Sequence, residues 1–195
     1  MTTQLPPITT IPSLTTDERA AILDTLFEKC APLHTLSVSL LREKTFTSYD
    51  ELIAAVGQQL MSLYDSNLES DDKWLVSILA AHPRLGEKKV ESAQSRAEQA
   101  KMNAADGAAG AASEDIAERL ANLNQVYEDK FPGLRYVVFV NGRSRPVIME
   151  DMQRRIDTSN LQQEKKDAIM VSQVGAFVSF AFPFHSISTT DVHFD

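Results

Sequence analysis

Residues 48–64 read SYDELIAAVGQQLMSLY, and this stretch decides the fold class. Its large apolar residues recur three or four positions apart, which places them on one face of an α-helix. They are Leu52, Ile53, Val56, Leu60, Leu63 and Tyr64. Ser48 precedes them, and a serine hydroxyl at this point can accept a backbone N–H of the first turn. The stretch therefore predicts an amphipathic helix that begins after Ser48 and buries one face.

The same spacing recurs along most of the chain. It covers segments near residues 16–30, 71–79, 113–131 and 144–156, and another from about residue 160 onward. Prolines and glycines separate several of these segments, and one short run of β-branched and aromatic residues, 136–140, favours an extended conformation. We therefore expect an all-α fold, a single domain of about seven or eight helices.

The boundaries of this domain follow from changes in composition. Residues 1–15 are rich in threonine and proline and are expected to form an extended N-terminal arm. The helical domain is expected to span residues 16–184, and residues 185–195 form a tail. Within the domain, residues 103–113 are small and predict a loop.

Composition and charge narrow the classes of partner. The 195 residues include 43% hydrophobic and 24% charged residues, as in an ordinary globular domain. The net charge of -8 argues against a broad nucleic-acid footprint, which needs clustered lysine and arginine. No apolar run approaches a membrane span, and no secretory signal is recognisable. We expect a cytoplasmic or peroxisomal protein, although the last residues, Val-His-Phe-Asp, are not a peroxisomal tripeptide.

Common cofactor and metal motifs are missing from the sequence. The glycines at 107 and 110 are not followed by the Lys-Ser/Thr of a phosphate-binding loop. The histidines lack the spacing of a zinc site, and Glu-x-x-His pairs of a helical metal hydrolase are absent. Cys30 is the only cysteine and lies on an apolar stripe, so we expect it in the core. These observations predict no cofactor and no metal.

Two polar clusters remain as candidates for chemistry. The first is His82-Pro83-Arg84-Leu85-Gly86, and its histidine should lie at a helix exit, because the residue before proline disfavours helical geometry. The second is Ser95-Arg96-Ala97-Glu98-Gln99. From the residues alone, Ser95 and Glu98 also fit a capping box at a helix start, and His82 fits a local structural residue. Both interpretations stay open at this point.

Taken in order, several motifs resemble one family, the 2-oxo-4-hydroxy-4-carboxy-5-ureidoimidazoline (OHCU) decarboxylases. The motifs are His82-Pro83 with Leu85-Gly86, Ser95-x-x-Glu98-Gln99, Asn124-x-x-Tyr127-x-x-Lys130-Phe131 and Gly142-Arg143-Ser144. The resemblance is clear to about residue 156 and is lost after about residue 170. It implies an all-helical, commonly dimeric protein that completes the conversion of urate to allantoin without metal or organic cofactor.

The resemblance also implies roles for single residues. His82 and Glu98 match the catalytic histidine and glutamate of the family. Ser95 and Gln99 match substrate-binding positions, and Pro83 lines the site.

The family also places an arginine in its last helix to bind the substrate. Residues 168–184 contain neither arginine nor lysine, so Arg84 and Arg143 are the candidates for a substrate-binding cation.

The expected activity is therefore decarboxylation of OHCU to S-allantoin by a carbon-carbon lyase. The protein is expected to be a homodimer that acts on a small-molecule substrate and has neither nucleic acid nor membrane as partner. The alternative is a helical binding or scaffold module that retains the fold without turnover.

Overall fold

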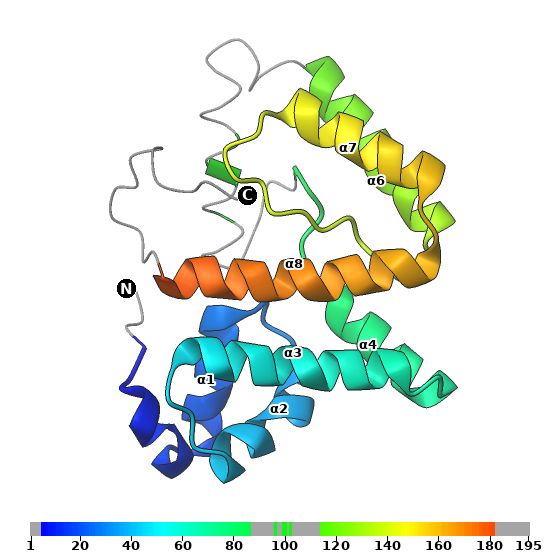
Figure 1. The fold of residues 1–195 in the computed structure, drawn as a ribbon. Coiled ribbons are helices and arrows are strands. Elements are labelled where there is room, and N and C mark those ends of the chain that lie inside the picture. Colours follow the sequence, from blue (N-terminus) through cyan, green and yellow to red (C-terminus); the bar gives the residue numbers. More distant parts are fainter. Residues whose placement is uncertain (1–4, 87–95, 97–98, 101, 103–113, 182–195) are drawn as a thin grey trace, which may run out of the picture.

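The computed structural model describes residues 5–86, 96, 99, 100, 102 and 114–181. Within these residues the chain forms one 3-10 helix and seven α-helices with defined bounds, residues 96, 99, 100 and 102 are also helical, and no strand is found (Figure 1). The elements are η1 (Ile8–Ser13), α1 (Thr16–Leu26), α2 (Ala31–Glu43), α3 (Tyr49–Asp65), α4 (Glu69–Leu79), α6 (Glu114–Lys130), α7 (Arg145–Thr158) and α8 (Leu161–Ala181). The predicted all-α fold class is confirmed, and the number of helices agrees with the expectation.

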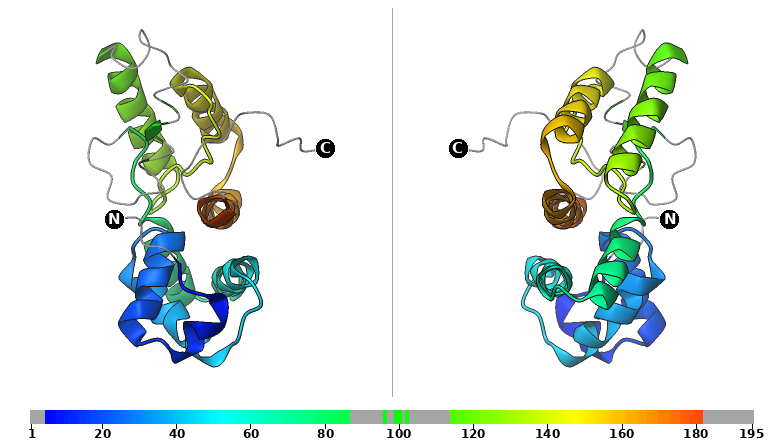
Figure 2. Two further views of the ribbon diagram at one scale, coloured as in Figure 1. Left: turned by 90° about the vertical axis from the view of Figure 1, so that its left-hand side faces the viewer. Right: turned by 90° about the vertical axis from the view of Figure 1, so that its right-hand side faces the viewer.

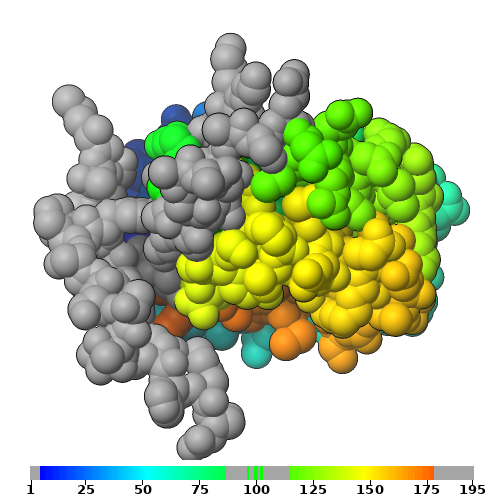
Figure 3. All heavy atoms as spheres, turned by 90° about the horizontal axis from the view of Figure 1, so that it is seen from above, coloured from blue at the N-terminus to red at the C-terminus, as the bar shows by residue number. Residues whose placement is uncertain are grey.

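Helix α8 lies between two groups of helices. It packs on α1, α3 and α4 on one side, while α6 and α7 pack on each other on the other side (Figures 1 and 2). Seen from above, α6, α7 and the segment that joins them form one face of the molecule (Figure 3). This arrangement brings residues late in the chain against the end of α4.

Helix boundaries follow the local signals in the sequence. Ser48 is the N-cap of α3, and its hydroxyl accepts a hydrogen bond from the backbone N–H of Glu51 over 3.2 Å. Thr15 caps α1 in a capping box with Glu18. Just after the C-terminal end of α6, Gly133 has a φ of 85°, a conformation that favours glycine, and the chain turns out of the helix there.

The core joins the apolar faces of these helices. Leu52, Val56 and Leu60 of α3 are almost fully buried, and so are Leu75 of α4 and Ile169 of α8. Each such side chain contributes on the order of 1.5–3 kcal/mol through the area it removes from water. Cys30 is buried at 7% exposure, which confirms its expected place in the core. No helix in the described ranges is long and apolar enough to cross a bilayer.

One local expectation was wrong. Residues 8–13 of the expected extended arm form the 3-10 helix η1, because Ile11 is fully buried and Tyr49 Oη donates a hydrogen bond of 2.7 Å to the carbonyl of Pro6. Residues 136–140 form no strand. Their carbonyls are instead bonded by side chains of neighbouring elements, so the segment has an irregular path that lines a pocket.

Candidate functional site

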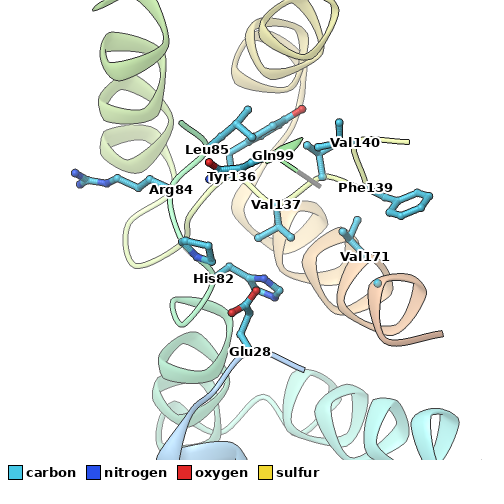
Figure 4. A pocket seen from close by; sticks show the side chains of 13 residues that line it. Glu28, His82, Arg84, Leu85, Gln99, Tyr136, Val137, Phe139, Val140 and Val171 are labelled. Atoms are coloured by element: carbon cyan, nitrogen blue, oxygen red, sulfur yellow. The ribbon is translucent and has the colours of Figure 1, made fainter. Parts of the chain in front are cut away.

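A pocket lies where the end of α4, the segment 136–140 and α8 meet (Figure 4). Apolar side chains form most of its wall, and His82, Glu28, Gln99 and Tyr136 supply polar groups. The full lining is Glu28, His82, Pro83, Arg84, Leu85, Gln99, Tyr136, Val137, Val138, Phe139, Val140, Val171 and Gly175. A small polar ligand can therefore meet a few hydrogen-bonding groups within an otherwise apolar surface.

Backbone contacts fix the segment that carries His82. Helix α4 ends at Leu79, and the chain leaves it through the predicted exit before Pro83. Arg135 donates a hydrogen bond from Nη1 to the His82 carbonyl over 2.8 Å, and Asn124 Nδ2 donates to the Leu85 carbonyl over 3.0 Å. These contacts hold the segment against α6 and against the chain that follows it.

Gly86 allows the chain to pass close to α6. Its φ is 86°, and an added Cβ would lie 2.7 Å from Leu120 Cδ2. A larger residue would strain the backbone and push the segment that carries His82 away from α6.

A serine of α8, Ser172, contacts the His82 imidazole. The ring Nε2 lies 2.8 Å from Oγ of Ser172, within hydrogen-bond distance. Burial lowers the pKa of His82 to about 4, and the positive charge of Arg135 acts in the same direction. His82 is therefore neutral at physiological pH and can accept a proton before it donates one.

The opposite wall of the pocket is attached to α7. Tyr136 Oη donates a hydrogen bond of 2.5 Å to Asp151 Oδ2, and Arg155 Nη1 donates one of 3.0 Å to the Val137 carbonyl. Arg143 Nη2 donates to the Phe139 carbonyl over 2.6 Å. Side chains thus satisfy the carbonyls that a strand would have used, which explains how an irregular segment can line the pocket.

A buried charged cluster lies behind this wall. Arg155 forms an ion pair with the fully buried Glu164, which also accepts a hydrogen bond from Tyr127 Oη. The Arg155 guanidinium lies 4.8 Å from the centre of the Tyr136 ring. Burial by itself would raise the pKa of Glu164, but hydrogen bonds from Arg155 and Tyr127 outweigh it and leave the pKa below its usual value.

Comparison of the sequence with known protein families shows which family the chain belongs to. A model of the family described as "OHCU decarboxylase" matches residues 12–173. The chain belongs to the OHCU decarboxylase family. The match extends beyond the clear part of the resemblance found in the sequence and ends close to residue 170, where that resemblance was expected to be lost.

A similar fold occurs in a solved structure described as "Crystal structure of OHCU decarboxylase in the presence of (S)-allantoin". The TM-score is 0.57 at 15% sequence identity, and the similarity covers 83% of this chain and 96% of the other. At this identity the likeness shows the fold. The comparison with curated proteins gave no match.

The structure brings several of the family's expected site residues together. His82, Pro83, Arg84 and Gln99 all line the one pocket. Ser95 and Glu98 lie outside the described residues, so the catalytic role expected for Glu98 and the binding role expected for Ser95 stay predictions.

The two expected cations are differently placed. Arg84 lines the pocket, but Figure 4 shows its guanidinium directed away from His82, and its Nε donates to Glu128 Oε1 over 2.6 Å. Arg143 is not among the lining residues and donates to the carbonyls of Phe139 and Val140.

Four polar residues at or beside the pocket were not predicted from the sequence. They are Glu28, Arg135, Tyr136 and Ser172. In Figure 4 the Glu28 side chain points toward the His82 ring. Ser172 had one usable signal, because it is a hydroxyl inside the apolar run AIMVSQVGAFV, whereas nothing local distinguishes Arg135 from other arginines.

Proposed function

We propose that this chain decarboxylates OHCU and releases S-allantoin. The observation that carries the proposal is a neutral histidine that lines a pocket of a family member together with Gln99, which the family resemblance implies as a substrate-binding residue. A neutral imidazole keeps a lone pair on one ring nitrogen, so His82 can act as a general base.

The chemistry needs one proton to be taken and one to be given. When the carbon–carbon bond to the carboxylate breaks, carbon dioxide leaves and the bonding electrons remain in the ring as an enol or enolate. As the hydroxyl-bearing carbon becomes a carbonyl, the ring carbon next to it must accept a proton on one face to give a single enantiomer. Neutral His82 can take a proton from the substrate hydroxyl and, as an imidazolium, return one to carbon.

Binding groups around His82 can set the face that is protonated. Gln99 offers an amide for the ring amides of the substrate, and Tyr136 lies on the same pocket wall (Figure 4). Orientation of this kind decides stereochemistry, because the proton donor is fixed on one side. Glu98 is proposed, as the family resemblance implies, to complete the catalytic pair.

For the substrate carboxylate we propose Arg135 as the cation. Arg135 is not among the lining residues of the pocket, but its charge is close enough to lower the pKa of His82, and its guanidinium is oriented by the His82 carbonyl. A guanidinium has five N–H donors, so one bond to a carbonyl leaves others for a carboxylate. Arg84, by contrast, already forms a two-point contact with Glu128.

The decisive experiment uses freshly generated OHCU and follows the circular dichroism of the allantoin produced. Spontaneous decay gives a racemate, so an optically active product that depends on the protein supports decarboxylation. A racemic product formed at the uncatalysed rate would instead favour a binding module.

Two further properties are proposed with this function. The first is that the reaction needs no metal or organic cofactor, so the rate should be unchanged after dialysis against a chelator. The second is a homodimer, which sedimentation velocity measures directly.

A further inference from the structure

Ser172 is buried on α8 and makes two contacts through one hydroxyl. It is 8% exposed, and its Oγ lies 2.8 Å from the carbonyl of Ala168, one helical turn earlier. The same Oγ lies 2.8 Å from Nε2 of His82. Both distances are those of ordinary hydrogen bonds.

The direction of these two bonds follows from the chemistry of the partners. A serine hydroxyl carries one hydrogen and two lone pairs, and a carbonyl oxygen can only accept. When the hydroxyl donates to Ala168, as serines within helices commonly do, Oγ can only accept from His82. Nε2 of the imidazole must then carry the proton.

We propose that Ser172 is a positioning residue that holds neutral His82 as the Nε2–H tautomer. The ring nitrogen bonded by a fixed partner determines which tautomer is present, so Nδ1 keeps its lone pair and is the base of the site. The part of this proposal that concerns turnover rests on the proposed decarboxylation, whereas the tautomer does not.

A fixed tautomer has a direct consequence for catalysis. A histidine with the wrong nitrogen protonated cannot accept the substrate proton, although it still fills the same space. The cost of losing Ser172 should therefore fall on the chemical step rather than on substrate binding.

The first experiment reads the tautomer in the protein without substrate. Nitrogen-15 NMR of the histidine side chains separates a protonated ring nitrogen from an unprotonated one, and the His82→Asn spectrum assigns the His82 signals. We expect Nε2 protonated and Nδ1 unprotonated at neutral pH in the parent. In Ser172→Ala we expect faster exchange of the Nε2 proton and a second tautomer.

The second experiment measures kinetics and rescue. We expect kcat of Ser172→Ala to fall about tenfold while KM changes less than about twofold, since the imidazole loses its orientation but the binding groups stay. Ser172→Thr keeps a hydroxyl at the same atom and should recover both the tautomer and most of kcat.

Ser37→Ala is the matched control, because Ser37 is also a buried helical serine and donates to Gln59 Oε1 over 2.9 Å. It should lose a similar amount of thermal stability with no change at His82. Protonated Nδ1 in the parent, or unchanged His82 signals in Ser172→Ala, would overturn the proposal. If the parent proves inactive on OHCU, the proposed function fails while the tautomer measurement still decides the role of Ser172.

Discussion

Two polar regions lie against helix α8, and one of them is charged while the other is neutral. Near its start, Glu164 is paired with Arg155 and bonded to Tyr127. Two turns later, Ser172 contacts His82, a group that burial keeps neutral. The first region contains the buried Arg155–Glu164 ion pair, and the second contains an uncharged histidine.

The difference lies in the partners that each group meets. For Glu164, burial is offset by hydrogen bonds from Arg155 and Tyr127, so the carboxylate stays ionised. For His82, burial and the charge of Arg135 both disfavour the protonated form, and the pKa is lowered even though the Glu28 side chain points toward the ring. Hydrogen bonds and an ion pair therefore keep Glu164 charged near the start of α8, while burial keeps His82 uncharged beside the middle of the helix.

Replacement of His82 gives the largest expected effect. We expect His82→Asn to lower kcat by about a thousandfold or more, in line with the loss of a general acid–base group, while the helical circular dichroism is unchanged. The measurement is initial rate of optically active allantoin formation. His34→Asn is the control, because His34 pairs with Asp24 away from the pocket and should retain parental rates. An active His82→Asn protein would remove this histidine from the mechanism.

Removal of the buried carboxylate tests the other region. Glu164→Gln leaves Arg155 buried without its counter-charge, which costs about 3–5 kcal/mol of unfolding free energy. Urea unfolding at pH 7 measures it. The control is Glu69→Gln, whose pair with Lys73 is 84% exposed on the glutamate side, and it should change stability by less than about 0.5 kcal/mol. Equal effects for both variants would mean that the buried pair contributes no more than a surface one.

The neutral histidine makes stability depend on pH. An unfolded histidine binds a proton near pH 6.5, whereas folded His82 does so only near pH 4. Between these values the unfolded state holds more protons, so this contribution is complete above pH 6.5 and is lost progressively toward pH 4.

We therefore expect the parent to lose up to about 3 kcal/mol more than His82→Asn over this window. Urea midpoints at several pH values give the difference, in which the titration of other groups cancels. Parallel curves for the two proteins would show that burial leaves the His82 pKa at its ordinary value.

Neutralisation of Arg135 is expected to have the smallest effect. Arg135→Gln should raise the pKa of His82, since a positive charge near the ring is removed, and should increase KM about tenfold through the lost charge-assisted bond to the substrate carboxylate. NMR titration and steady-state kinetics measure the two changes. Arg84→Gln is the comparison and should change KM less. A larger KM for Arg84→Gln would assign the cation role to the residue that the sequence first suggested.

Local sequence signals accounted for much of the fold. The spacing of Leu52, Val56 and Leu60 predicted α3, because burial of one helical face depends only on residues close in the chain. The hydroxyl of Ser48 and the turn at Pro132-Gly133 marked helix ends for the same reason. The 3-10 helix at residues 8–13 was not predicted, because it depends on the burial of Ile11 in a core that other segments form.

The sequence by itself determined that the chain is helical, that His82 stands at a helix exit before proline, and, through the ordered motifs, which family it belongs to. Only the tertiary structure decided the state of that histidine. Ser172 lies 90 positions after it and Arg135 lies 53 positions after it, and both reach it because α8 and the segment before α7 pack against the end of α4. Burial and electrostatic fields depend on distance in space, so no local pattern could have given the charge of His82 or the partner of its Nε2.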